Sequence, residues 1–202
     1  MSADSGETRE LLERARRGEA AAFEELFARH RERLRQGIGL RLDRRVAARL
    51  DVSDVLQETY LEAARRLPAY LARPDLPFYA WLCWLAREKV LECHRAHLGA
   101  GKRAVGRELP PLGDSSALLV GGLLGPGPTP SQAAAAAELA ERLRLALEAL
   151  DDDERELILW RHFEQLRNQE VARLLGITPA AANKRYVRAL QRLRGLLGGP
   201  GG

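Results

Sequence analysis

Basic side chains gather near the end of the chain with no acid between them. From residue 182 to residue 194 the sequence holds five Lys and Arg residues and no Asp or Glu. They are Lys184, Arg185, Arg188, Arg192 and Arg194. Cationic groups spaced along one helix are suited to a nucleic-acid phosphate backbone. A solvated surface helix carries similar charges, so the stretch needs further local features before it indicates DNA.

The residues before and within this stretch predict two short helices joined by a tight turn. Asn168 can cap the first helix, and Gly176 can end it because glycine adopts the left-handed conformation at low cost. Thr178 can cap the second helix, whose first position suits Pro179 because no N–H is needed there. The small Ala182 permits a close helix crossing. The pattern predicts a helix-turn-helix, and a plain helical hairpin with a basic face is the alternative.

The second helix of a helix-turn-helix lies in the major groove of DNA and offers its N-terminal residues to base edges. Asn pairs with adenine and Arg or Lys with guanine, whereas later arginines contact phosphates. We therefore expect DNA contacts from Thr178, Ala180, Asn183, Lys184, Arg185, Arg188 and Arg192.

Two further clusters lie earlier in the chain. Asp54, Gln57 and Glu58 share one exposed face of a predicted helix, which fits a docking surface or simply a soluble acidic face. Aromatic residues are concentrated at Phe78, Tyr79, Trp81 and Trp84. Helical spacing places most of these rings in a core, although ring faces also stack on unpaired bases.

Composition restricts the function classes. The net charge is +4 and the two cysteines, Cys83 and Cys93, are ten residues apart. That is about 15 Å of helix rise, too far for a disulfide, so we expect a reduced, cytoplasmic protein. We expect no signal peptide and no membrane span, because residues 1 to 22 lack an apolar core and no apolar run is long enough. Cys93, His94 and His97 could be metal ligands, but no further Cys or His cluster completes four ligands, so we expect no metal site, and we expect no cofactor. No phosphate-binding glycine loop or nucleophile–base pair indicates an enzyme.

Hydrophobic periodicity and sparse β-branched residues predict an all-α protein. We expect helices over 7–18 with Gly18 at the end, from Phe23 to Leu34, from the capping residue Asp51 to a stop at Pro68, and over 78–97. Further on, Asp151 to Asp153 can cap a helix, and the stretch before it carries a leucine stripe at helical spacing: Leu139, Leu143, Leu147 and Leu150. Residues 98–131 hold eight glycines and five prolines and are predicted to be a flexible linker. The expected organisation is therefore two small helical domains, 7–97 and 132–197, joined by residues 98–131.

Four stretches, in this order, resemble bacterial RNA polymerase sigma factors of the extracytoplasmic-function type. Residues 151–197 resemble region 4, which includes a helix-turn-helix. "AFEELFARHRERL", "DVSDVLQETYLEAARRL" and "FYAWLCWLAREKVLECHRAHLGAGKR" resemble successive parts of region 2. The resemblance covers roughly three quarters of the chain in the family's order and spacing.

This resemblance implies partners and roles. Region 4 would read the −35 promoter duplex, and region 2 would bind the −10 element and help to melt it. Asp54, Gln57 and Glu58 would bind the β′ clamp helices of core RNA polymerase, whose β subunit is a further expected partner. An anti-sigma factor is also implied. Contacts with the melted −10 strand are expected from Phe78, Tyr79, Trp81, Arg87, Lys89, Arg95, Lys102 and Arg103.

The sequence departs from the family at Glu88, where many members carry Asn; an acid there changes or removes a base contact, so the family's −10 sequence does not carry over to this chain. It also departs in the recognition helix, which reads "PAAANKRY". A free-standing helix-turn-helix regulator is the alternative function, but it would have no need of the Asp54, Gln57 and Glu58 face. A helical adaptor that never binds DNA is a second alternative.

Overall fold

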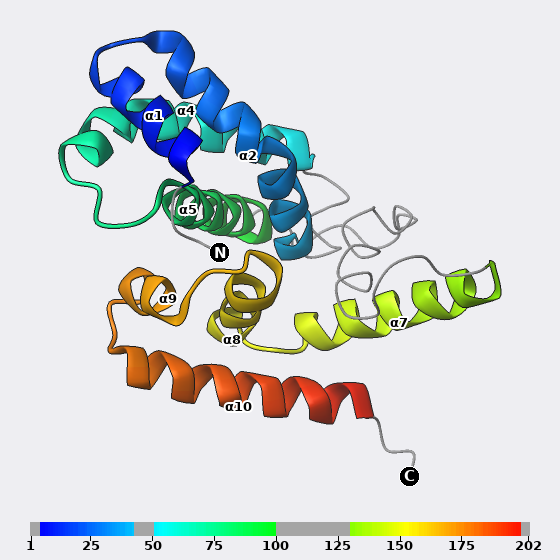
Figure 1. Ribbon diagram of the computed structural model, residues 1–202. Helices are drawn as coiled ribbons and strands as arrows, with labels where there is room; N and C mark the ends of the chain where they lie inside the picture. Colours follow the sequence, from blue (N-terminus) through cyan, green and yellow to red (C-terminus); the bar gives the residue numbers. More distant parts are fainter. Residues whose placement is uncertain (1–4, 43–50, 100–129, 199–202) are drawn as a thin grey trace. The chain divides into compact units, whose positions relative to one another are not determined.

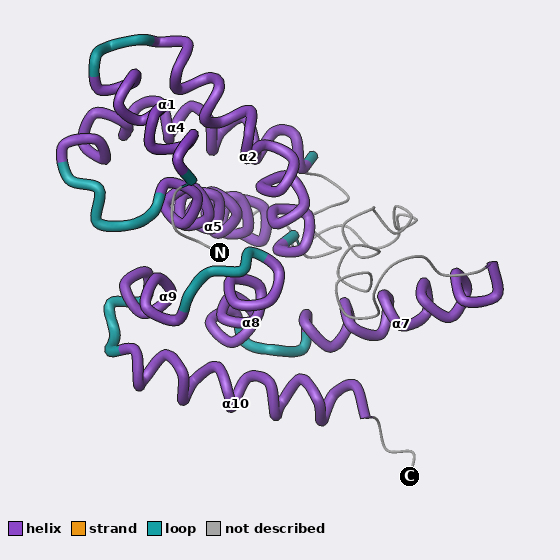
Figure 2. The backbone as a smooth tube through the Cα atoms, viewed as in Figure 1, coloured by secondary structure: helices purple, strands orange, loops and turns teal. Residues whose placement is uncertain are grey.

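The computed structural model describes residues 5–42, 51–99 and 130–198, and every regular element in these ranges is helical (Figure 1, Figure 2). The prediction of an all-α protein is thus confirmed. The chain divides into two compact units, Met1–Leu109 and Pro110–Gly202. Most of the predicted linker, with Lys102 and Arg103 near its start, lies outside the described residues, so the domain limits stay a prediction.

The first unit contains four described helices: α1 (Gly6–Arg16), α2 (Ala20–Arg41), α4 (Val52–Ala72) and α5 (Phe78–Gly99). Helix α2 packs against α1, α4 and α5, and α4 also packs against α5. The core between them is apolar and fully buried at Leu26, Leu34, Ile38, Val55, Phe78, Leu82 and Leu85.

Local chemistry explains where the helices of the first unit begin and end. The Ser5 hydroxyl accepts from the Thr8 N–H at 3.2 Å and starts α1. Gly18, predicted to follow the first helix, adopts a φ of +86° there. The Asp51 carboxylate accepts from the Ser53 N–H at 2.8 Å, which confirms it as the cap of α4.

Pro68 does not end its helix, contrary to prediction, because α4 continues to Ala72 with Pro68 inside it. Proline removes one helical hydrogen bond, at a cost of about 3 kcal/mol. The following turn is held from outside the helix. The Tyr70 hydroxyl donates to the Leu76 carbonyl at 2.9 Å, and its ring stacks on Trp81 at 4.5 Å between centroids. These tertiary contacts offset part of that cost.

The second unit contains α7 (Pro130–Glu148), α8 (Asp152–Ile158), the π-helix η1 (Leu159–Phe163), α9 (Asn168–Leu174) and α10 (Pro179–Gly198). The predicted leucine stripe of α7 packs on α8 and α10. The cluster consists of Leu143, Ala146, Leu147, Leu150, Ile158, Ala189 and Leu193, with Leu190 and Leu197 packed against it. The Asp151 carboxylate caps α8 by accepting from the Glu154 N–H at 2.8 Å, as predicted.

A π-helical turn follows α8 and redirects the chain toward α9. The Glu164 N–H donates to the Leu159 carbonyl at 2.9 Å, one residue further back than in an α-helix. Gln165 then adopts a φ of +52°, and Trp160 is buried beneath the turn. The turn leaves Arg161 and His162 on the side that meets α10.

Candidate nucleic-acid interface

Helices α9 and α10 form the predicted helix-turn-helix. Gly176 lies between them with a φ of +63°, so the bend predicted at this glycine is confirmed. The Thr178 hydroxyl accepts from the Ala181 N–H at 3.2 Å and caps α10, also as predicted. Ala182 is completely buried where the helices cross.

Asn168 was expected to cap α9, and that prediction is wrong. Asn168 is the first residue of α9, and its side-chain amide donates to the Pro179 carbonyl at 2.8 Å. The Glu170 carboxylate instead accepts from the Arg167 N–H at 2.7 Å at the helix start. Asn168 therefore ties the beginning of α9 to the beginning of α10 and fixes the angle between them.

The buried residues of α10 determine which of its side chains face outward. Ala182, Ala189 and Leu193 are buried and define the inward direction. At 3.6 residues per turn, Lys184 lies about 160° and Arg188 about 120° from that direction. Both side chains are exposed, so both lie on the outward face. Ala180, Asn183 and Gln191 are also exposed, and they lie about 100–180° from the buried side.

Arg185 and Arg192 occupy a flank of α10 and not the centre of its outward face. They lie only about 60° and 80° from the buried direction, although both are exposed. Arg192 contacts Glu154 at 2.8 Å and Asp151 at 3.4 Å. These ion pairs join α10 to the start of α8. A phosphate would have to compete with them for Arg192.

Tyr186 anchors the opposite flank of α10 to η1, a contact that sequence reasoning missed. Its hydroxyl hydrogen-bonds His162 Nε2 at 2.5 Å, and the two rings lie 5.5 Å apart. The Arg161 guanidinium lies 5.2 Å from the Tyr186 ring centroid, and it also donates to the Leu166 carbonyl at 3.1 Å. We call Arg161, His162 and Tyr186 the α10 anchor. Nothing in the local sequence pattern pairs residues 24 positions apart.

The electrostatics of the α10 anchor keep both rings uncharged near neutral pH. Burial, together with the charge of Arg161, lowers the pKa of His162. Burial raises the pKa of Tyr186, against the opposing effect of Arg161. A neutral imidazole and a neutral phenol can share a hydrogen bond, so the anchor holds without an ionised partner.

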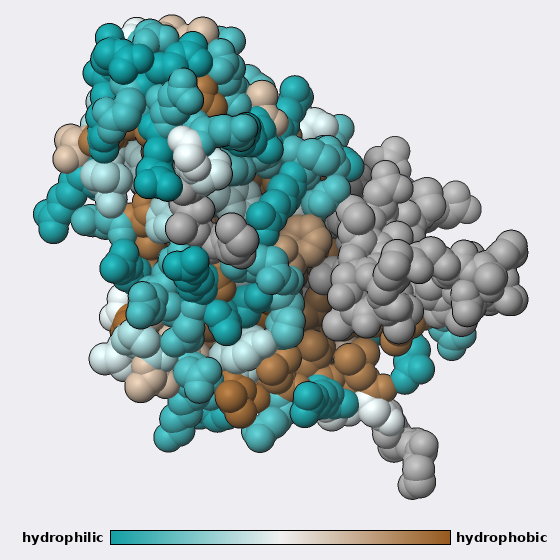
Figure 3. All heavy atoms as spheres, in the orientation of Figure 1, coloured by the Kyte–Doolittle hydropathy of each residue, from teal (hydrophilic) through white to brown (hydrophobic). Residues whose placement is uncertain are grey.

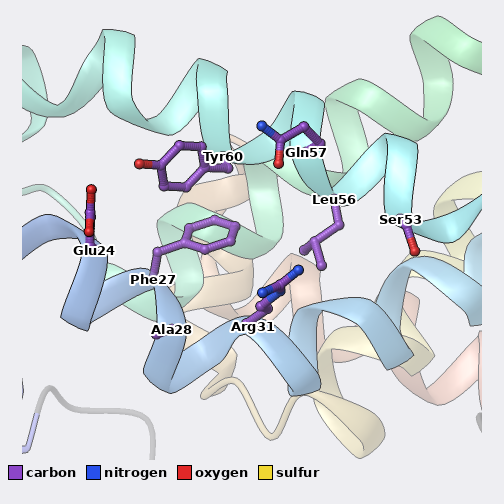
Figure 4. A pocket seen from close by; sticks show the side chains of 8 residues that line it. All are labelled: Glu24, Phe27, Ala28, Arg31, Ser53, Leu56, Gln57 and Tyr60. Atoms are coloured by element: carbon purple, nitrogen blue, oxygen red, sulfur yellow. The ribbon is translucent and has the colours of Figure 1, made fainter.

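The first unit presents the predicted polar face on α4. Asp54, Gln57 and Glu58 are all exposed there. Gln57 also lines a hollow of about 240 Å³ between α2 and α4 (Figure 4). Phe27 and Tyr60 meet edge to face at 5.0 Å in this hollow. Its remaining lining residues are Glu24, Ala28, Arg31, Ser53 and Leu56. An apolar floor with polar and charged groups beside it is suited to a protruding side chain of another protein.

The aromatic cluster of α5 is core, so its first three rings are not placed to stack on bases as expected. Phe78 is 0%, Tyr79 8% and Trp81 7% exposed. The centroids of the His30 and Tyr79 rings lie 5.0 Å apart, and the Arg33 guanidinium carbon lies 4.4 Å from the Tyr79 ring centroid. These rings are buried because their large apolar area gains more free energy from burial than from contact with water or unpaired bases. Trp84 is half-buried, with Arg66 5.3 Å from its ring.

The cations predicted to hold the −10 strand differ in their surroundings. Lys89 contacts Glu92 at 2.9 Å, and this hydrogen bond raises the Lys89 pKa. Arg95 is exposed and donates to the Leu91 carbonyl at 3.3 Å, whereas Arg87 is half-buried. Glu88 contacts Arg66 at 3.3 Å, which partly balances its charge.

Among the residues that the structure describes, no group of three or more His, Cys, Asp or Glu side chains is arranged to hold a metal ion. None of the helices in the described ranges has the length and apolar character needed to cross a membrane.

A capped, glycine-turned helix pair with an exposed basic face defines a DNA-binding helix-turn-helix protein. Comparisons with known proteins narrow this class. The family description "Sigma-70, region 4" matches residues 140–193, which contain α8, α9 and most of α10. The RNA polymerase sigma factor CarQ of Myxococcus xanthus is 33% identical, over 93% of this chain and 95% of its own length.

Two further matches agree. The probable RNA polymerase sigma factor RfaY of Xanthomonas campestris pv. campestris is 33% identical over 78% of this chain, which spans only 36% of that longer protein. The structure of CnrH in complex with the cytosolic domain of CnrY aligns over 96% of this chain and 99% of CnrH. Its TM-score is 0.64 at 26% identity.

The chain belongs to the RNA polymerase sigma factors, of the extracytoplasmic-function type. It therefore acts in promoter-directed initiation of transcription and is not a free-standing regulator.

Proposed function

We propose that α10 reads the −35 promoter duplex with its outward face, while the Asp54, Gln57 and Glu58 face of α4 binds the clamp helices of core RNA polymerase. The observation that carries the first part is the acid-free, exposed outer side of α10, held by the Thr178 cap and the Gly176 turn. Lys184, Arg188 and Asn183 are exposed and carry hydrogen-bond donors of the kinds that pair with base edges in the major groove.

The roles of the cations on α10 divide by their position. Lys184 and Arg188 lie centrally and contact bases, whereas Arg185 lies on the flank, where the groove wall presents phosphates. Arg192 gives up part of its pairing with Glu154 and Asp151 if it also contacts a phosphate. Loss of a base contact relaxes specificity at one position, whereas loss of a phosphate contact weakens all sequences equally.

The polymerase surface is proposed to combine the polar face with the adjoining hollow. Gln57 belongs to both, so it lies where an inserted side chain and the polar rim meet (Figure 4). The first unit is also proposed to bind and help melt the −10 element, with Arg87, Lys89 and Arg95 near its phosphates. Its buried rings then act by shaping α5, since they are closed to solvent.

Run-off transcription with core polymerase on a genomic fragment library tests this assignment. Gln57→Ala is expected to reduce transcript from every promoter, through weaker association with core. Arg188→Ala is expected to reduce promoter recognition while association with core is kept. Glu10→Ala, an exposed acid on α1, is the matched control for the α4 face and is expected to leave both unchanged. If Gln57→Ala behaves like Glu10→Ala, the α4 face is not the polymerase contact.

An anti-sigma partner is proposed from kinship. The structural relative CnrH was solved with the cytosolic domain of CnrY. We expect this chain to be held by an inhibitory protein that competes with core polymerase. Copurification of the tagged chain from its own cells, followed by run-off transcription with and without the copurified protein, tests this. A copurified protein that leaves transcription unchanged contradicts it.

A further inference from the structure

One large apolar side chain stands on the basic outer face of α10. Val187 is 43% exposed although it sits between Lys184 and Arg188, which are also exposed. At 100° per residue it lies about 140° from the buried direction set by Ala182, Ala189 and Leu193. It is therefore on the side that the proposed function turns toward DNA.

Val187 does not belong to the core cluster that packs beneath α10. That cluster contains Ala189 and Leu193, with Leu190 and Leu197 packed against it. The helix is fixed instead by this cluster, the α10 anchor and the Arg192 ion pairs. Over the part of Figure 3 where α10 runs in Figure 1, hydrophobic and hydrophilic side chains lie side by side.

The neighbours of Val187 define where an apolar group would be received. Lys184, Gln191 and Ala180 are three, four and seven residues away, respectively, and share its stripe along the helix. Lys184 and Gln191 offer polar atoms to base edges, whereas Ala180 and Val187 offer only methyl groups. In the major groove the one apolar feature of a base edge is the C5-methyl of thymine.

Resting on the proposed −35 role of α10, we propose that Val187 is a specificity-determining residue that packs on a thymine methyl in the −35 duplex. The polar side chains around it recognise hydrogen-bonding groups of neighbouring base pairs. Val187 then distinguishes thymine from cytosine, which lacks the methyl, at one position. No bond is formed or broken in this step.

The test deletes the methyl from either side of the contact. The full chain with core polymerase first selects its upstream duplex from a random library. Each thymine of the selected −35 element is then replaced singly by deoxyuridine, which removes only the methyl. Equilibrium binding of holoenzymes carrying wild-type chain, Val187→Ala or Leu196→Ala is measured at one salt concentration. Leu196 is the matched control, an aliphatic residue of α10 that is 41% exposed and off the outward stripe.

One thymine is expected to respond. Loss of its methyl weakens wild-type binding about fourfold, which corresponds to ~0.8 kcal/mol for one buried methyl. In Val187→Ala the same replacement changes binding less than about twofold, the scatter expected between uncoupled sites. Leu196→Ala keeps the wild-type pattern.

Two different results separate the two proposals. If the wild-type holoenzyme selects a −35 element but no thymine in it responds in a Val187-dependent way, the Val187 contact is overturned and the −35 role of α10 stands. If Arg188→Ala and Lys184→Ala leave selection unchanged, the −35 role itself is overturned, and the Val187 contact with it.

Discussion

Truncation of Tyr186 to alanine should destabilise the packing of α10 more than truncation of the exposed Arg185 on the same helix does. Tyr186→Phe deletes only the hydrogen bond to His162, worth about 1 kcal/mol. Tyr186→Ala also removes the ring pair with His162 and the contact with Arg161, about 0.5–1.5 and 0.5–1 kcal/mol. The sum for Tyr186→Ala is about 2–3 kcal/mol, discounted because the side chain is only partly buried.

Amide hydrogen exchange of peptides from α10 in the full chain measures this loss directly. A loss of 2 kcal/mol speeds local exchange by about thirtyfold, and a loss of 1 kcal/mol by about fivefold. Arg185→Ala, the neighbouring exposed residue, is the control and should change exchange less than about threefold. Equal exchange in Tyr186→Ala and Arg185→Ala would refute the reasoning, because the anchor would then contribute nothing that an exposed side chain does not.

Two other predictions concern stability. The pKa of His30 is lowered from 6.5 to about 4 by burial and by Arg33 and Arg29. Because the folded-state pKa is lowered, the stability that depends on neutral His30 is fully present above pH 6.5 and is lost as the pH falls toward 4. The loss in the free energy of unfolding is at most about 3 kcal/mol, and it is smaller than this limit because the ring is not fully buried. Urea unfolding of wild type and His30→Leu at pH 7 and 4.5 should show a smaller acid loss in the variant; parallel losses contradict it. Gly176→Ala meets no atom within 4 Å but keeps a φ of +63°, so it should cost about 1–2 kcal/mol of strain alone. A melting temperature equal to wild type would show that the turn relaxes.

Features that depend on neighbours in the chain were predicted well. The caps at Asp51, Asp151 and Thr178 involve an oxygen and an N–H two or three residues apart. The turn at Gly176 depends on the conformational freedom of one residue. These choices are decided by local chemistry, so a single sequence contains them.

Features that depend on distant partners were not predicted. Asn168 has the side chain of a helix cap, but the Pro179 carbonyl, 11 residues on, takes its amide. Pro68 has the chemistry of a helix stop, but Tyr70 holds the next turn through Leu76 and Trp81. In both cases a tertiary contact outweighs the local preference, and no pattern along the chain specifies that contact.

The basic stretch of α10 shows why a count of charges is a weaker guide than their angular position. Sequence reasoning divided its cations only by their order along the helix, with base contacts expected from the earlier ones and phosphate contacts from the later arginines. The buried Ala182, Ala189 and Leu193 divide them, because Arg192 lies on a flank where it contacts Glu154 at 2.8 Å. Part of the positive charge therefore stabilises the unit that presents the helix, and part faces outward. The same angular argument brings Val187 and Gln191 onto the outward stripe, although neither carries charge. The identity of the reading face is thus set by the core beneath it: a change of the buried stripe would rotate a different set of side chains toward DNA without altering the net charge.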